Sequence, residues 1–427
     1  YQIEGAVTAG GRLPSIWDTF SHTGGKVRDG DTGDVACDHY HRWRHDIRLM
    51  KELGVAGYRF SIAWPRIFPE GRGRSNPEGL AFYDRLVDGL LEAGITPYAT
   101  LYHWDLPQML YDQGGWLNRD TAAAMADYAA AVAGRLGDRV KDWMTINEPW
   151  VASHLGHGTG EHAPGHTDWA EVWPVAHHLL VAHGLSTQAV RATVPSARVG
   201  IVLNLEPQYP ASQHPLDIAA TRLADGTWNR WFLDPISGRG YPEDATAAVE
   251  WDQAQVRDGD LDLIATATDF LGVNFYSRKI IRSEELAEAD RPGRPPQPEE
   301  TTEMGWEVYP EGLYDMLTRV QTDYEFPLIY VTENGAAFAD ELVDGEVHDP
   351  ARISYLERHL AQVHRAIDAG VPVAGYFAWS LMDNFEWGHG YSKRFGLTYV
   401  DYISQDRIVK ASGRWYADVI QRGGLRT

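Results

Sequence analysis

Three stretches of the chain repeat one pattern of apolar and polar positions. Apolar residues first recur at helical spacing, a glycine follows, and a short apolar run rich in strand-forming residues comes next. The pattern predicts a helix that ends at the glycine and leads into a β-strand. The predicted helix and strand pairs are residues 46–53 with 55–62, 77–93 with 95–101, and 350–369 with 373–379.

The ends of these helices carry specific signals. Asn76-Pro77 and Asp349-Pro350 each place a capping side chain before a proline, which fits the first turn of a helix. Gly54, Gly94 and Gly370 stand where the helices should end, because glycine readily adopts the left-handed conformation found at helix C-termini.

Four further segments predict buried strands, namely residues 142–147, 199–205, 270–275 and 328–332. The resulting seven strands alternate with helical sequence, which is typical of a parallel sheet. At this chain length the alternation favours a (β/α)8 TIM barrel, a single domain over residues 1–427 with long βα loops. One strand is unaccounted for, and we expect it to be the first, missing from the sequence as printed.

Two long connections separate the predicted strands. Residues 207–242 and 282–307 show no clear apolar pattern, and residues 291–298 are polar and rich in proline. This composition predicts loops on the surface. No linker divides the chain into two domains.

Charge and cysteine content exclude several classes of partner. The chain has 38 Lys and Arg against 60 Asp and Glu, a net charge of -22, so nucleic acid and anionic membranes are poor partners. Its single cysteine, Cys37, cannot form an internal disulfide, and no apolar run reaches the roughly 20 residues of a membrane span. These features predict a cytoplasmic protein, although a start at Tyr1 leaves room for a removed leader.

The ends of the predicted strands carry polar and aromatic side chains. In a (β/α)8 barrel the C-terminal ends of the strands form the active site. Glu148 and Glu333 are the most informative, because glutamate is disfavoured in strands and costly to bury. The other residues at these ends are Arg59, His103, Trp104, Asn147, Asn274, Tyr276 and Trp379, the last leading toward Glu386 and Trp387.

Paired carboxylates suit glycoside hydrolysis, in which one group is protonated and the other is ionised. Pro149 removes a backbone donor next to Glu148, whereas we expect Arg59 to face Glu333 across the barrel. A neighbouring arginine lowers the pKa of a carboxyl group, and a neighbouring negative charge raises it. This favours Glu333 as nucleophile and Glu148 as general acid/base.

Two motifs, Thr145-Ile-Asn-Glu-Pro149 and Val331-Thr-Glu-Asn-Gly335, resemble the signatures of glycoside hydrolase family 1, the β-glucosidase family. The resemblance implies a retaining β-glycosidase that releases terminal non-reducing β-D-glucosyl residues from β-glucosides and cello-oligosaccharides, without a metal or organic cofactor. The likeness extends through residues 1–6, 58–67, 102–107, 274–276 and 379–387.

The same resemblance assigns roles to individual residues. Glu148 matches the acid/base and Glu333 the nucleophile, Asn147 the residue that holds the sugar 2-hydroxyl, and Arg59 and Tyr276 the groups that orient the nucleophile. The substrate-binding residues that it implies are Gln2, His103, Trp104, Asn147, Asn274, Trp379, Glu386 and Trp387, with Phe395 behind them and Trp306 as an aglycone-side wall.

Two positions narrow the substrate, and one departure leaves an alternative open. The carboxylate of Glu386 would repel a sugar 6-phosphate, and an acid rather than an amide at Glu148 argues against a thioglucosidase. The family's apolar first strand, which should precede Tyr1, is missing here. A barrel truly without it would leave Gln2 without the strand that aims it, and could be a weak or inactive sugar-binding protein.

Several histidines raise a rival interpretation. His39 and His41 form a His-x-His pair like those in metal-dependent hydrolases, but no further set of ligands at strand ends accompanies it. His177, His178 and His183 have helical spacing, and we expect structural roles for them. Cys37 should be buried and inert, because no base partner is apparent.

Overall fold

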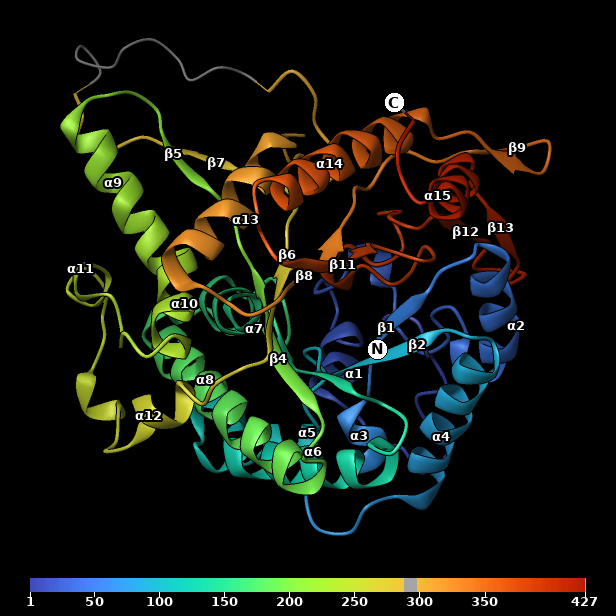
Figure 1. The fold of residues 1–427 in the computed structure, drawn as a ribbon. Helices are drawn as coiled ribbons and strands as arrows, with labels where there is room; N and C mark the ends of the chain where they lie inside the picture. The colour runs from blue at the N-terminus through green and yellow to red at the C-terminus, as the bar shows by residue number, and fades with distance from the viewer. Residues whose placement is uncertain (288–297, 427) are drawn as a thin grey trace.

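A computed structural model describes residues 1–287 and 298–426 of the chain (Figure 1). Within these residues the main sheet has seven parallel strands in the order β1-β2-β3-β4-β6-β8-β11, with helices around its outside. All seven predicted strands are confirmed, with ends that shift by a few residues. They are β1 (Gly57–Ser61), β2 (Thr96–Tyr102), β3 (Asp142–Asn147), β4 (Arg198–Asn204), β6 (Phe270–Asn274), β8 (Ile329–Asn334) and β11 (Val373–Ala378).

Long helices connect these strands, and shorter elements decorate the connections. The long helices are α2 (His39–Glu52), α4 (Pro77–Glu92), α6 (Asp120–Leu136), α8 (Trp169–Thr193), α13 (Glu311–Tyr324), α14 (Pro350–Asp368) and α15 (Ala411–Arg422). The short helices are α1 (Ile16–Ser21), α3 (Trp64–Ile67), α5 (Gln108–Tyr111), α7 (Pro149–Ser153), α9 (Pro215–Asp225), α10 (Trp231–Ile236), α11 (Glu243–Thr246) and α12 (Asp260–Ile264). The small strands are β5 (Gln208–Pro210), β7 (Lys279–Ile281), β9 (Leu342–Val343), β10 (Glu346–Val347), β12 (Thr398–Val400) and β13 (Arg407–Val409).

The predicted helix signals are mostly confirmed. The Asn76 side chain accepts a hydrogen bond from the backbone N–H of Glu78 at 3.2 Å, and glycines 54, 94 and 370 have positive φ angles. Asp349 precedes α14 but gives it no side-chain cap, because its carboxylate bonds to Arg352 and Ser412 instead. The start of α2 was predicted too late, since its buried face already begins at His39.

One loop prediction is wrong. Residues 207–242 contain β5, α9, the π-helical turn η4 (Gly226–Arg230) and α10. The sequence gives little sign of α9 because only Asp217 is buried along it, so the helix has no apolar stripe, and it lies at the periphery of the molecule in Figure 1. Of the proline-rich stretch 291–298, all but the exposed Pro298 lies outside the described residues.

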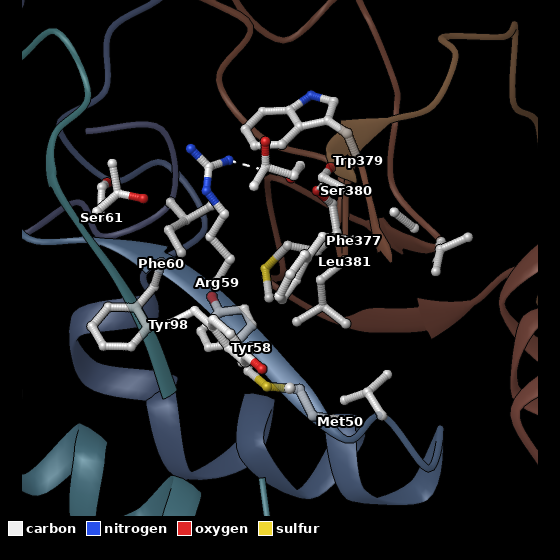
Figure 2. A pocket seen from close by; sticks show the side chains of 18 of the residues that line it. Met50, Tyr58, Arg59, Phe60, Ser61, Tyr98, Phe377, Trp379, Ser380 and Leu381 are labelled. Carbon is white, nitrogen blue, oxygen red and sulfur yellow. Dashed lines mark hydrogen bonds between the residues drawn. The ribbon is translucent and has the colours of Figure 1, made fainter. Parts of the chain in front are cut away.

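The barrel has an open seam between β1 and β11, which are the two ends of the sheet. Among the described residues no strand pairs with their facing edges, and a cavity of about 450 Å³ lies between them (Figure 2). Arg59 from β1 and Trp379 from beyond β11 both line this cavity. The expected absence of a first strand from this sequence is therefore confirmed.

Tyrosines of the outer helices hold the strands in place. The Tyr128 hydroxyl of α6 donates to the carbonyl oxygens of Ile62 and Leu101, at 2.8 and 2.9 Å. Because one hydroxyl serves the ends of two neighbouring strands, helix packing is tied to strand alignment near the barrel mouth. No helix in the described part of the chain is long and apolar enough to cross a membrane.

We predict that Gly335→Ala disrupts the C-terminal ends of β8 and β11. A Cβ atom at Gly335 would lie 1.7 Å from the carbonyl oxygen of Trp379, so the two segments must separate. Crowding of this kind destabilises proteins by about 2 kcal/mol, and we expect a similar loss in denaturant unfolding together with a large loss of activity.

Gly134→Ala provides the matched control. Gly134 lies on the exposed side of α6, and its nearest neighbour to an added Cβ is 3.6 Å away. There the same substitution should stabilise the protein by about 0.5 to 1 kcal/mol through helix propensity. Equal unfolding free energies for the two variants would contradict the packing described here.

Candidate active site

The predicted site residues gather at the C-terminal ends of the barrel strands. At these ends the ladder is irregular, with register shifts between Met144 and Asn147 in β3 and between Val273 and Asn274 in β6. Such bulges redirect side chains, and they recur beside active sites. The second shift brings Asn274 opposite Glu333 of β8.

Three of the predicted residues have strained backbone conformations. Trp104, Glu148 and Trp387 have φ angles of 76°, 48° and 50°, which side-chain-bearing residues rarely adopt. Strain of this kind persists only where the surrounding structure enforces it, and it concentrates at functional sites.

Glu333 is held at both carboxylate oxygens. Arg59 Nη1 donates to Oε1 and the Tyr276 hydroxyl donates to Oε2, each at 2.6 Å. The arginine and glutamate side chains are only 6% and 5% exposed, so their ion pair is largely shielded from water. Two donors on one buried carboxylate fix its orientation, as the sequence predicted for Arg59 and Tyr276.

Glu148 has a different environment. Its Oε1 accepts one hydrogen bond, at 2.6 Å from Asn274 Nδ2, and its side chain is buried. Burial and the negative charge of Glu333 raise the pKa of Glu148 well above its usual range, against the smaller opposing effects of Asn274 and Arg59. A carboxyl group in this position holds its proton at neutral pH.

Asn147 connects the two carboxylates. Its Oδ1 accepts from Arg59 Nη2 at 2.6 Å and from Asn274 Nδ2 at 3.1 Å, and its Nδ2 lies 3.2 Å from His103 Nε2. Burial and the positive charge of Arg59 lower the pKa of His103 well below its usual range, so this imidazole is neutral. The residues around the two glutamates therefore form one hydrogen-bonded unit.

Aromatic rings form the walls of the site. The rings of Trp104 and Trp387 lie 4.7 Å apart, and His103 stacks 6.1 Å from Trp379. On the other side Trp306 lies 5.2 Å from Tyr276 and 6.2 Å from Phe395. This mixture of flat apolar faces and short polar groups suits sugar rings.

Two polar groups face the site near its rim. Burial and the charge of Glu333 raise the pKa of Glu386 to about 8, and its Oε2 is buried without a hydrogen-bond partner within the described chain. Gln2 Nε2 donates to Asn384 Oδ1 at 3.1 Å, and Phe385 N–H donates to the Gln2 carbonyl oxygen at 3.1 Å. Gln2 is thus fixed by the segment after β11, without a preceding strand to aim it.

The sequence reasoning missed two supporting residues. The Thr332 hydroxyl donates to Asn274 Oδ1 at 2.7 Å and thereby directs the amide nitrogen toward Glu148. Asn384, the partner of Gln2, is the other. Both lie inside the quoted motifs, but simple strand alternation places Thr332 and Glu333 on opposite faces, and only the bulge near Asn274 brings both to one network.

Glycosyl hydrolase family 1 provides a family model that matches residues 1–425, almost the entire chain. The chain belongs to glycosyl hydrolase family 1. A relative in the family, Beta-glucosidase A of Thermotoga maritima, is 49% identical, with 100% of this chain and 96% of that protein covered.

Solved structures agree with the family 1 assignment. The AHE enzyme from Alicyclobacillus herbarius has 54% sequence identity and a TM-score of 0.95, covering 99% of this chain and 96% of that one. The Thermotoga maritima β-glucosidase in complex with glucoimidazole has 48% identity and a TM-score of 0.94, covering 100% and 96%. The (β/α)8 TIM-barrel fold expected from the sequence is confirmed, with seven of its strands in the described residues.

The histidines outside the family 1 motifs have structural partners. His39 Nδ1 bonds to buried Asp46 at 2.7 Å and His41 Nδ1 to Asp38 at 2.6 Å, so the pair does not converge on one point. His177, His178 and His183 each hydrogen-bond within the core, as expected. Cys37 is fully buried, and burial raises the pKa of its thiol, which makes it inert.

We predict that the pKa of Glu148 depends on the charge of Glu333. The Glu333→Gln variant removes that charge, so Glu148 should titrate at lower pH, as measured by carbon NMR of labelled carboxyl groups. In the parent protein, activity should fall on the alkaline side as Glu148 loses its proton.

Glu357→Gln makes the same chemical change on the exposed surface of α14 and serves as control. It should leave the Glu148 titration unchanged. A Glu333→Gln variant with the parental Glu148 titration would show that the two groups do not share a site.

Proposed function

We propose that the protein is a retaining β-glucosidase that removes terminal non-reducing β-D-glucosyl residues from β-glucosides and cello-oligosaccharides, and so contributes to cellulose degradation. The observation that supports this most is the contrast between two buried glutamates. Glu333 accepts two strong hydrogen bonds, whereas burial and the charge of Glu333 raise the pKa of Glu148. Retaining glycosidases need this division of labour.

The first half of the proposed reaction breaks the glycosidic bond. A carboxylate oxygen of Glu333 forms a bond to the anomeric carbon while the bond to the leaving oxygen breaks, and Glu148 transfers its proton to that oxygen. Arg59 and Tyr276 orient the attacking carboxylate. The product is a covalent glycosyl-enzyme and a free aglycone.

The second half regenerates the enzyme. Once Glu333 is esterified it no longer carries a charge, so the pKa of Glu148 falls and its carboxylate can accept a proton from water. The hydroxide equivalent attacks the anomeric carbon and displaces Glu333. Two inversions retain the β configuration.

The surrounding residues favour an uncharged sugar. Asn147 is placed to hold the 2-hydroxyl, and Gln2, His103, Trp379, Glu386 and Trp387 form the expected pocket for the glycone, with Asn274 and Trp104 beside them. The unpaired buried oxygen of Glu386 can accept a hydrogen bond from a sugar hydroxyl. The same carboxyl group would disfavour a 6-phosphate.

The proposed substrate is small, which agrees with the sugar-like inhibitor named in the Thermotoga maritima complex. We also propose a cytoplasmic location, because the one cysteine is a reduced, buried thiol and the net charge is strongly acidic.

An aryl β-glucoside assay in the presence of chelator tests the proposal. We expect hydrolysis whose initial rate does not respond to chelator, because no step uses a metal ion. A rate that chelator abolishes would favour the metal-dependent hydrolase, and binding of the sugar without turnover would favour the sugar-binding barrel.

Azide rescue tests the assignment of the two glutamates. Glu333→Gly should lose nearly all hydrolysis and regain turnover with azide, giving an α-glycosyl azide, because the anion occupies the space left by the nucleophile. Glu148→Gly should instead yield a β-glycosyl azide from an activated substrate, since Glu333 still forms the intermediate. Reversed anomers in the two products, read by proton NMR, would reverse the assignment.

A further inference from the structure

The loop between α7 and α8 gathers two imidazoles and a carboxylate away from the two catalytic glutamates. His157 belongs to the π-helical turn η3 (His154–Thr159), His166 to the following loop, and Glu171 to the first turn of α8. The Nδ1 atoms of His157 and His166 lie 2.9 and 2.6 Å from the same oxygen, Oε2 of Glu171. All three atoms lie within 4.8 Å of one another.

The backbone places these groups together without their help. The N–H groups of Gly165 and His166 both donate to the Gly156 carbonyl oxygen, at 3.2 and 3.0 Å, and Asp168 N–H donates to the His157 carbonyl oxygen at 2.8 Å. These bonds close the loop on itself and bring His166 beside His157. The cluster is therefore preorganised by main-chain bonds.

The position of Glu171 in its helix also frees it for another partner. Asp168 caps α8 by accepting from Ala170 N–H at 3.0 Å, and a glutamate three residues after such a cap commonly bonds back to the cap's N–H. Here that N–H is already taken by His157. The Glu171 carboxylate turns to the two histidines instead.

We propose that His157, His166 and Glu171 form a binding site for a divalent transition-metal ion of the zinc type. Two imidazole nitrogens and one carboxylate oxygen are a recurring ligand set for zinc, with the fourth position open to water. Burial lowers the pKa of His157, which keeps its imidazole in the neutral form that metal binding requires.

The outer surroundings match a ligand site. The other nitrogen of His166, Nε2, lies 2.7 Å from the Tyr111 hydroxyl, which can accept its proton while Nδ1 binds the ion. His157 is 4% exposed, but His166 and Glu171 are 31% and 24% exposed, so an ion can enter from solvent. Coordination requires the nitrogen and oxygen atoms to move apart to about 3.3 Å, as tetrahedral zinc geometry sets.

A bound ion would cross-link η3, the loop and α8. The same loop carries His162, whose ring lies 5.3 Å from Trp104 and 6.2 Å from Trp387 in the wall of the candidate active site. The ion is therefore expected to stabilise this wall against heat, while the glutamates of the proposed reaction remain untouched. The inference is independent of the proposed β-glucosidase activity.

Metal binding to the full chain tests the proposal directly. After removal of metals with chelator, the protein should bind one Zn²⁺ per chain in a calorimetric titration, and Co²⁺ should give the intense visible absorption of a four-coordinate nitrogen and oxygen site. Zn²⁺ should also raise the unfolding temperature, because it binds the folded state. Absence of stoichiometric binding would overturn the proposal.

Variants locate the ion. His166→Ala and Glu171→Gln should abolish the stoichiometric binding and the Co²⁺ absorption, whereas His364→Ala, which removes an exposed histidine paired with Asp368, should leave both unchanged. Tyr111→Phe keeps all three ligands and should weaken binding about tenfold. If His166→Ala fails to fold, Tyr111→Phe and Glu171→Gln decide the matter, and unchanged binding in both would exclude this site.

Discussion

The buried ion pair between Arg59 and Glu333 is the contact on which the candidate site depends. Removing two charges from water is costly, and their attraction offsets the cost only when the remaining donors and acceptors are also paired. Here Arg59 reaches Asn147 with its other nitrogen, and Tyr276 satisfies the second oxygen of Glu333. The positions of these residues are therefore set together by electrostatics.

The same constraint explains why Glu148 and Glu333 differ. Arg59 compensates one carboxylate, so the second, placed in the same closed space, meets the full cost of burial and of a neighbouring negative charge. Asn274 offers Glu148 a single hydrogen bond, which is too little to hold it ionised. Two identical side chains thus acquire opposite tendencies from their surroundings, and no change of residue type is needed.

The sequence predicted what depends on local periodicity and could not predict what depends on long-range contacts. The barrel strands and the pairing of Arg59 with Glu333 followed from apolar runs and from the rule that strand ends meet. Helix α9 was missed because its burial has no apolar stripe, and Thr332 was missed because a bulge alters the facing of its strand. Asn384 was missed because its contact with Gln2 joins residues far apart in the chain.

The open seam shows how far the site is independent of a complete sheet. If strand pairing aimed Gln2, the gap beside β1 and β11 would release it, yet its carbonyl oxygen and amide are bonded to Phe385 and Asn384. The carbonyl oxygen of Ile3 is likewise bonded to the N–H groups of Cys37 and His39. The edge of the pocket is therefore held by loop contacts, and an unpaired strand edge nearby affects stability more directly than it affects the geometry around Glu333.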